Sequence, residues 1–165
     1  GMVYARMDRT GDIYRIRRTQ LTFAESAGLN TLLDRFVSPV VVATLSQMRV
    51  TTVDGETTLR IEYENGDDNI GQRWFRDENA VTRDEFTDAY LSIIALQFDQ
   101  TAPQEAAGTS LLADVTFTLR DGSTSTVRYE ACDAFYALVT TDGGGRFLVR
   151  LTDVENMLTV LKGEK

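Results

Sequence analysis

The chain of 165 residues contains no histidine. Without an imidazole there is no serine–histidine or cysteine–histidine dyad, no histidine general base near neutral pH, and no histidine-ligated zinc or iron site. This absence excludes every enzyme class that depends on one of those arrangements. We therefore expect a protein that is not an enzyme and that needs no cofactor.

Cysteine is nearly absent as well, since Cys132 is the only one. A single cysteine cannot form an internal disulfide, so the sequence does not indicate a redox compartment. In the stretch "RYEACDAFY" the thiol lies between Glu130 and Asp133, whose negative charge disfavours the reactive thiolate. A structural cysteine, packed as a small apolar side chain, is the favoured interpretation.

Long apolar runs and excess positive charge are also missing. No run of about 18 apolar residues occurs, and no charged segment leads into an apolar one, so these residues predict neither a membrane-spanning helix nor a signal peptide. The 25 acidic residues outnumber the 17 basic ones, for a net charge of -8. This excess of negative charge disfavours nucleic acid and anionic membrane surfaces as partners.

What is present is typical of one folded domain, with 42% hydrophobic and 25% charged residues. Alternating stretches flank short turns at residues 54–55, 121–122 and 143–145, which predicts three antiparallel hairpins. A fourth hairpin is expected over residues 3–16, and a short strand over "QRWFR" at residues 72–76. The segment "DQTAPQEAAGTS" at residues 99–110 reads as a loop.

Three helices are predicted, over residues 22–36, 82–98 and 152–161. Each begins with a Thr-x-x-Glu capping box, formed by Thr22 and Glu25, Thr82 and Glu85, and Thr152 and Glu155. Their expected buried stripes are Leu29, Leu32, Leu33 and Phe36 in the first, Phe86, Ala89, Tyr90, Ile93, Ile94 and Gln97 in the second, and Val154, Met157, Leu158 and Leu161 in the third. The expected fold class is α+β, in which antiparallel hairpins form a sheet with about three helices packed against it.

The start and the end of the chain share one pattern. Tyr4-Ala5 and Tyr136-Ala137 each begin a strand, a glycine-containing turn, a second strand and a helix. We interpret residues 3–36 as a hairpin plus helix that resembles the end of a preceding repeat, and residues 40–162 as the main α+β domain.

The order of these features resembles a known family. The stretches "RWF", "LSIIALQF", "DVTFTLRDGS" and "FYALV…GGGRFLV" resemble the bacterial domain of unknown function 4340 family over nearly the whole chain. The resemblance implies an extracytoplasmic domain, usually tethered by an N-terminal membrane helix, often repeated, and sometimes encoded near transporter components. It brings no catalytic residues.

One acidic region is a candidate ligand site. The stretch "EYENGDDNIGQRWFRDE" holds Glu62, Glu64, Asp67 and Asp68, followed by Trp74. Paired carboxylates can run glycosidase chemistry without histidine, and an exposed aromatic ring can stack on a ligand. Packing in the core is nevertheless the favoured interpretation of Trp74.

The same stretch partly matches a calcium-binding loop. Asp67, Asn69, Gly71 and Glu78 have the spacing of ligand positions, but Gln72 stands where that loop needs glycine. A solvated acidic turn is therefore favoured, and we expect no metal site.

Two functions from different classes follow. The first is a noncatalytic extracytoplasmic interaction module of a bacterial cell-envelope protein, which presents a sheet face or edge to another envelope protein or a neighbouring repeat. It would contact the membrane only through a tether outside this chain. The alternative is a carboxylate-based sugar-processing or sugar-binding domain that uses residues 62–68. An enzyme needs a concave pocket in which these acids converge, whereas an interaction module does not.

Overall fold

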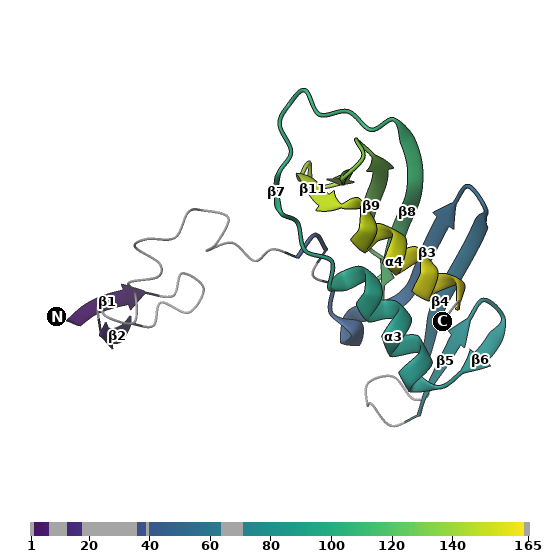
Figure 1. Cartoon of the computed structure of the whole chain (residues 1–165). Helices are drawn as coiled ribbons and strands as arrows, with labels where there is room; N and C mark the ends of the chain where they lie inside the picture. The colour runs from purple at the N-terminus through teal and green to yellow at the C-terminus, as the bar shows by residue number, and fades with distance from the viewer. Residues whose placement is uncertain (1, 7–12, 18–35, 39, 64–70, 164–165) are drawn as a thin grey trace. The chain divides into compact units, whose positions relative to one another are not determined.

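The computed structural model describes residues 2–6, 13–17, 36–38, 40–63 and 71–163 (Figure 1). The chain divides into two compact units, residues 1–35 and residues 36–165. In the first unit, β1 (Met2–Arg6) pairs antiparallel with β2 (Ile13–Arg17), and Tyr4 lies opposite Arg15. The expected N-terminal hairpin is therefore confirmed. Its turn, and the helix expected over residues 22–36 except for Phe36, lie outside the described residues.

The second unit is built on a nine-stranded sheet in which all neighbouring strands are antiparallel, in the order β6-β5-β4-β3-β8-β9-β10-β11-β7. A single turn of 3-10 helix, η2 (Val42–Thr44), precedes it. The strands are β3 (Leu45–Thr52), β4 (Gly55–Tyr63), β5 (Gln72–Arg76), β6 (Asn79–Val81), β7 (Gln100–Thr101), β8 (Ser110–Leu119), β9 (Thr124–Ala131), β10 (Tyr136–Thr141) and β11 (Arg146–Arg150). Two meanders of consecutive strands, β3 to β6 and β8 to β11, meet where β3 pairs with β8.

The turn chemistry explains most of the hairpins. Gly122 and Gly144 have φ of 84° and 81°, a backbone conformation that glycine adopts without steric cost. The three predicted hairpins of this unit are confirmed. A fourth, between β5 and β6, was not predicted. It turns at Asp77, which has φ of 54° and whose carboxylate accepts a hydrogen bond from the Thr58 amide at 2.9 Å.

Two helices lie side by side on one face of the sheet, α3 (Arg83–Ile94) and α4 (Leu151–Lys162). The described part of the chain thus contains two α-helices instead of about three. The α+β class is confirmed, with sheet predominating.

Only one of the two described helices begins as predicted. The Thr82–Glu85 capping box is formed, with the Thr82 hydroxyl oxygen accepting from the Glu85 amide at 3.3 Å. The Thr152–Glu155 box is not formed, and that prediction was wrong. Strand β11 ends at Arg150 and α4 begins at the next residue, so Thr152 already lies inside the first turn.

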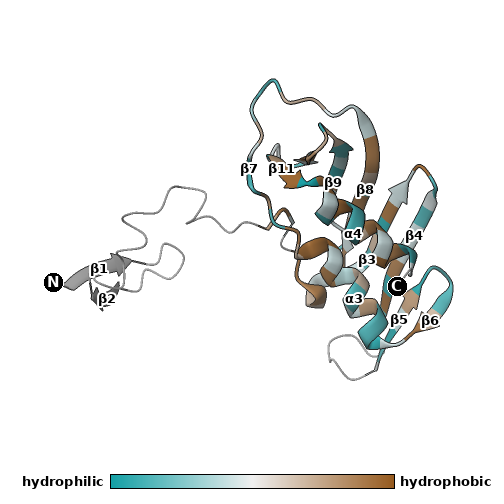
Figure 2. Cartoon of the chain, viewed as in Figure 1, coloured by the Kyte–Doolittle hydropathy of each residue, from teal (hydrophilic) through white to brown (hydrophobic). Residues whose placement is uncertain are grey.

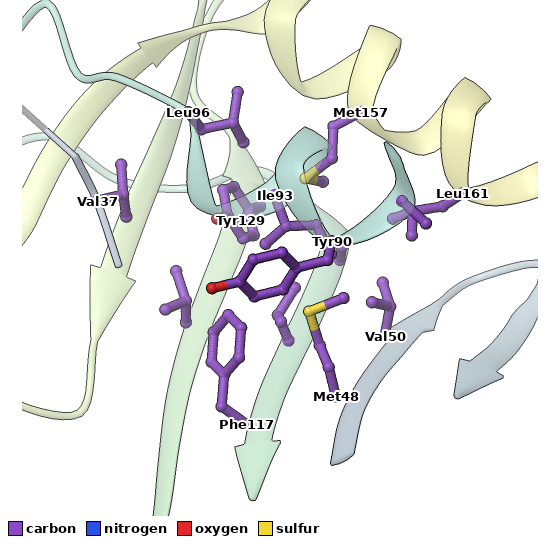
Figure 3. Packing of buried hydrophobic residues seen from close by; sticks show 14 of the residues in the cluster. Val37, Met48, Val50, Tyr90, Ile93, Leu96, Phe117, Tyr129, Met157 and Leu161 are labelled. Carbon is purple, nitrogen blue, oxygen red and sulfur yellow. The ribbon is translucent and has the colours of Figure 1, made fainter. Parts of the chain in front are cut away.

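The core fills the space between the helices and the sheet (Figure 3). Met48 of β3 lies between Leu59 of β4 and Phe117 of β8, and all three are buried. The helices contribute Phe86, Ala89, Tyr90, Ile93, Val154, Met157 and Leu161, as their predicted stripes require. Each large apolar side chain buried here is worth about 1.5–3 kcal/mol. The prediction for Gln97 was wrong, since this residue lies beyond the end of α3 and is exposed.

Two buried tyrosines in this core differ in their hydrogen bonding. The Tyr90 hydroxyl donates to the carbonyl of Val40, in the segment that leads into β3. The Tyr129 hydroxyl is fully buried and has no hydrogen-bond partner among the residues that the structure describes. Burial raises the pKa of both hydroxyls above its ordinary value.

The loop between β7 and β8 is bound to the sheet by hydrogen bonds at two places. The Arg146 guanidinium donates to the carbonyls of Gln104, at 3.1 Å, and Ala106. Further along the loop, the Thr109 amide donates to the Ala131 carbonyl at 2.7 Å. The loop is thus bound to both β11 and β9.

Candidate interaction surfaces

The structure separates the described members of the predicted acidic site. Trp74 lies opposite Ile61 on the core side of the sheet, and its ring packs against Phe86 with centroids 4.7 Å apart. The preference for core packing of Trp74 is confirmed. Glu62 is the next residue along β4, so it belongs to the opposite face of the sheet.

On that opposite face Glu62 pairs with a base. Its carboxylate forms an ion pair with Arg60, and its side chain remains 46% exposed. Arg73 lies directly across from it on β5. Glu64, Asp67 and Asp68 fall outside the described residues. Glu62 and Trp74 therefore form no shared pocket, and no group of three or more metal-ligating side chains is assembled within the described ranges.

Two exposed carboxyl groups have shifted pKa values, both downward. The Lys162 ammonium, 2.9 Å from the Asp54 carboxylate, lowers the pKa of Asp54. Hydrogen bonds from Ser123 lower the pKa of Asp121. A general acid that protonates a sugar oxygen needs a raised pKa, so neither group is suited to that role.

The face of the sheet opposite α3 and α4 carries no helix among the described residues and is called the helix-free face. It is polar, and several of its charges pair with one another. Arg128 and Asp114 are 3.1 Å apart across β9 and β8, and Arg49 and Glu56 are 3.5 Å apart across β3 and β4. The Arg60 guanidinium stacks on the ring of Phe75 at 4.4 Å. These contacts suit a solvated surface.

Cys132 lies in the turn between β9 and β10 and is half-buried. Its amide donates to the Tyr136 carbonyl at 3.0 Å. The neighbouring Asp133 carboxylate accepts from the amides of Phe135 and Tyr136 at 2.7 and 2.8 Å. The local hydrogen bonds thus give Asp133 a role in shaping the turn.

A shallow groove of about 410 Å³ runs between α3 and α4 on the outer side of the helical layer. Leu91 and Val160, 45% and 39% exposed, contribute apolar surface from the two helices, and the buried Met157 and Leu96 lie beneath. Polar side chains of Ser92, Gln97, Asp153 and Asn156 line the remainder. Figure 2 shows that α3 is hydrophilic in its first turn and mainly hydrophobic toward its end.

The groove carries negative charge. Asp153 is the only charged residue among the described residues that line it. Asp88 precedes Leu91 by one turn of α3, on the same stripe, and is exposed. Within its described turns, α3 has no basic residue at its C-terminal end, where the helix dipole is negative.

Sequence reasoning missed this groove, although a signal for it exists. Leu91 and Val160 are apolar residues that fall outside the buried stripe of their own helix. Each helix has such a residue outside its buried stripe. The two residues indicate a second apolar surface only when the two helices are known to pack side by side.

Other exposed apolar side chains lie away from this groove, and Phe135 lines a hollow of about 610 Å³ at the start of α4. Phe135, at the turn before β10, is 75% exposed, and Val53 lies at the tip of the β3–β4 hairpin. The outermost strands, β6 and β7, have three and two residues. Such short edges offer few backbone groups to an added strand.

Within the part of the chain that the structure describes, no helix combines the length and the apolar character needed to cross a membrane. Comparisons of the chain with protein-family models, with curated proteins and with solved structures found no match.

Proposed function

We propose that this chain is a noncatalytic interaction module of a bacterial cell-envelope protein and that its contact surface is the groove between α3 and α4. The observation that carries the proposal is the pair Leu91 and Val160, two exposed apolar side chains that line one groove from different helices. Apolar surface framed by polar side chains is characteristic of protein contact sites.

The other surfaces support a binding role less well. The sequence favoured a sheet face or edge, but the charges on the helix-free face pair with one another and the edge strands are short. For the sugar-processing alternative, Glu62 is the one described acid of residues 62–68, and its carboxylate forms an ion pair with Arg60. The helical side of the domain is thus the better supported contact surface.

The proposed location outside the cytoplasm, with a membrane tether in the full-length protein, rests on the resemblance to the domain of unknown function 4340 family. It is tested by adding protease to spheroplasts of cells that express the full-length gene. Degradation of the domain in intact spheroplasts, with a cytoplasmic marker preserved, is expected. Protection until the cells are lysed would contradict this part of the proposal.

The contact surface is tested by photo-crosslinking in the same cells. A photoreactive amino acid replaces Leu91 or Val160. In the matched control it replaces Thr116 of β8, which lies on the helix-free face of the sheet. We expect a discrete adduct of the same mass from Leu91 and Val160, identified by mass spectrometry, and none from Thr116. Adducts from Thr116 alone would move the interface to the sheet, and no adduct from either helix position would overturn the proposal.

A further inference from the structure

The chemistry of the groove indicates what kind of partner it fits, and this step rests on the proposed function. A groove between two packed helices has the shape that receives a third helix, whose side chains at spacings of three and four residues enter it. Leu91, Ala95 and Val160 are exposed along it, and Met157 lies at its floor. The apolar surface therefore matches the apolar stripe of an amphipathic helix.

The charges around the groove favour a basic partner. Residues 1–35 hold 6 of the 17 basic residues and 4 of the 25 acidic residues. The remaining 11 bases and 21 acids belong to residues 36–165, so this unit has a net charge of −10. Such an excess steers cationic partners toward the surface and repels anionic ones.

The local charges point the same way. Asp153 lies at the end of the groove where α3 terminates, and Asp88 continues the stripe of Leu91 toward the other end. The bases near the groove have partners of their own. Lys162 bonds Asp54 at 2.9 Å, and Arg150 bonds Asp99 at 3.0 Å and also interacts electrostatically with Asp153. Arg76 donates to the carbonyl of Val160 at 3.3 Å. The described side chains that line the groove nevertheless include one acid, Asp153, and no base.

We infer that the groove between α3 and α4 binds an amphipathic helix of a partner protein, with its apolar stripe against Leu91 and Val160 and an arginine or lysine beside Asp153. The acidic rim would then select basic over acidic helices of equal hydrophobicity. The apolar contact supplies affinity, and the charge supplies the discrimination.

The test uses the whole chain and two designed peptides as probes. Both peptides are helical, carry leucines at spacings of three and four, and differ only in having arginine or glutamate beside the leucines. Fluorescence anisotropy measures each dissociation constant at low and at moderate salt. We expect the arginine peptide to bind at least about tenfold more tightly than the glutamate peptide, with the difference shrinking as salt rises.

Substitutions then assign the binding to the groove. The double variant Leu91→Gln, Val160→Gln should weaken the arginine peptide by about tenfold or more, and Asp153→Asn should reduce the discrimination between the two peptides. The matched controls are Val53→Gln, another exposed apolar residue, and Asp121→Asn, an exposed acid distant in the chain. Neither control should change binding, and circular dichroism checks that all variants fold.

Several outcomes overturn the inference. Equal binding of the two peptides, or no binding of either, would refute the basic helix while leaving the proposed function intact if Leu91 still yields its adduct in cells. Concentration-dependent self-association abolished by Leu91→Gln would make a second copy the occupant. An intramolecular cross-link from Leu91 would assign the groove to a segment of this chain.

Discussion

Replacing Tyr129 by phenylalanine should stabilise the protein, although it removes a polar group from the centre of the core. The hydroxyl is fully buried and has no hydrogen-bond partner among the described residues. A buried polar group without a partner costs about 1–3 kcal/mol. The void left by one oxygen atom is smaller than a methyl group, so its cost is below about 1 kcal/mol. The expected net gain in the free energy of unfolding is about 1 kcal/mol.

Tyr90→Phe is the matched control, because it removes the same atom from a tyrosine of the same core. Here the hydroxyl donates to the Val40 carbonyl, and its loss should cost about 1 kcal/mol. Urea unfolding followed by tryptophan fluorescence measures both, and a change of 1 kcal/mol corresponds to about 2–4 °C in the melting temperature. A loss of 1 kcal/mol or more in Tyr129→Phe would show that its hydroxyl is hydrogen-bonded, and would refute the reasoning.

The same hydroxyl predicts how stability depends on alkaline pH. Burial raises the pKa of Tyr129 in the folded state above its value of about 10 in the unfolded chain. Above pH 10 the unfolded state binds fewer protons than the folded state, so stability is complete below about pH 10 and falls as pH rises toward the folded pKa. Tyr129→Phe should flatten this decline, and an unchanged slope between pH 10 and the onset of unfolding would contradict the assignment.

Four further substitutions test three separate features. Thr82→Ala should lower the free energy of unfolding by about 1 kcal/mol because it removes a formed helix cap, whereas Thr152→Ala should change it by less than about 0.5 kcal/mol. Urea titrations measure both, and similar losses in the two variants would be inconsistent with the described helix starts. Arg146→Ala should release the loop of residues 102–109 and speed its cleavage by a nonspecific protease under native conditions; unchanged cleavage would mean that the loop is held by other contacts. Cys132→Ser should leave the melting temperature and the peptide binding nearly unchanged, and loss of binding with an unaltered melting temperature would give the thiol a function.

Much of the fold could be predicted because local chemistry determines it. The turns near Gly55, Gly122 and Gly144 join strands adjacent in the chain, and the stripe of Phe86, Tyr90 and Ile93 already specifies the buried side of α3. These features depend on residues only a few positions apart. Alternation and helical periodicity are therefore sufficient to find them.

What could not be predicted depends on distant contacts. The β5–β6 turn is supported by Thr58, nineteen positions before Asp77, and no pattern near Asp77 indicates it. The Thr152 box fails because β11 continues to Arg150, a boundary that cross-strand pairing decides. The groove exists only because two helices far apart in sequence pack together. Tertiary contacts, which a local pattern does not contain, determine all three.

The pairing of β3 with β8 has a consequence for how the domain folds. Each meander forms from hairpins that close short loops. The pairing of Met48 with Phe117 instead joins two strands that are separated in the sequence by the rest of the first meander, α3 and β7. Closing that long loop is slow, so we expect the joining of the two meanders to limit the folding rate. During synthesis on the ribosome, β3 remains an open edge with Met48 and Val50 uncovered until β8 emerges. This interval is when the nascent chain is most exposed to aggregation and when a chaperone would have the most to shield.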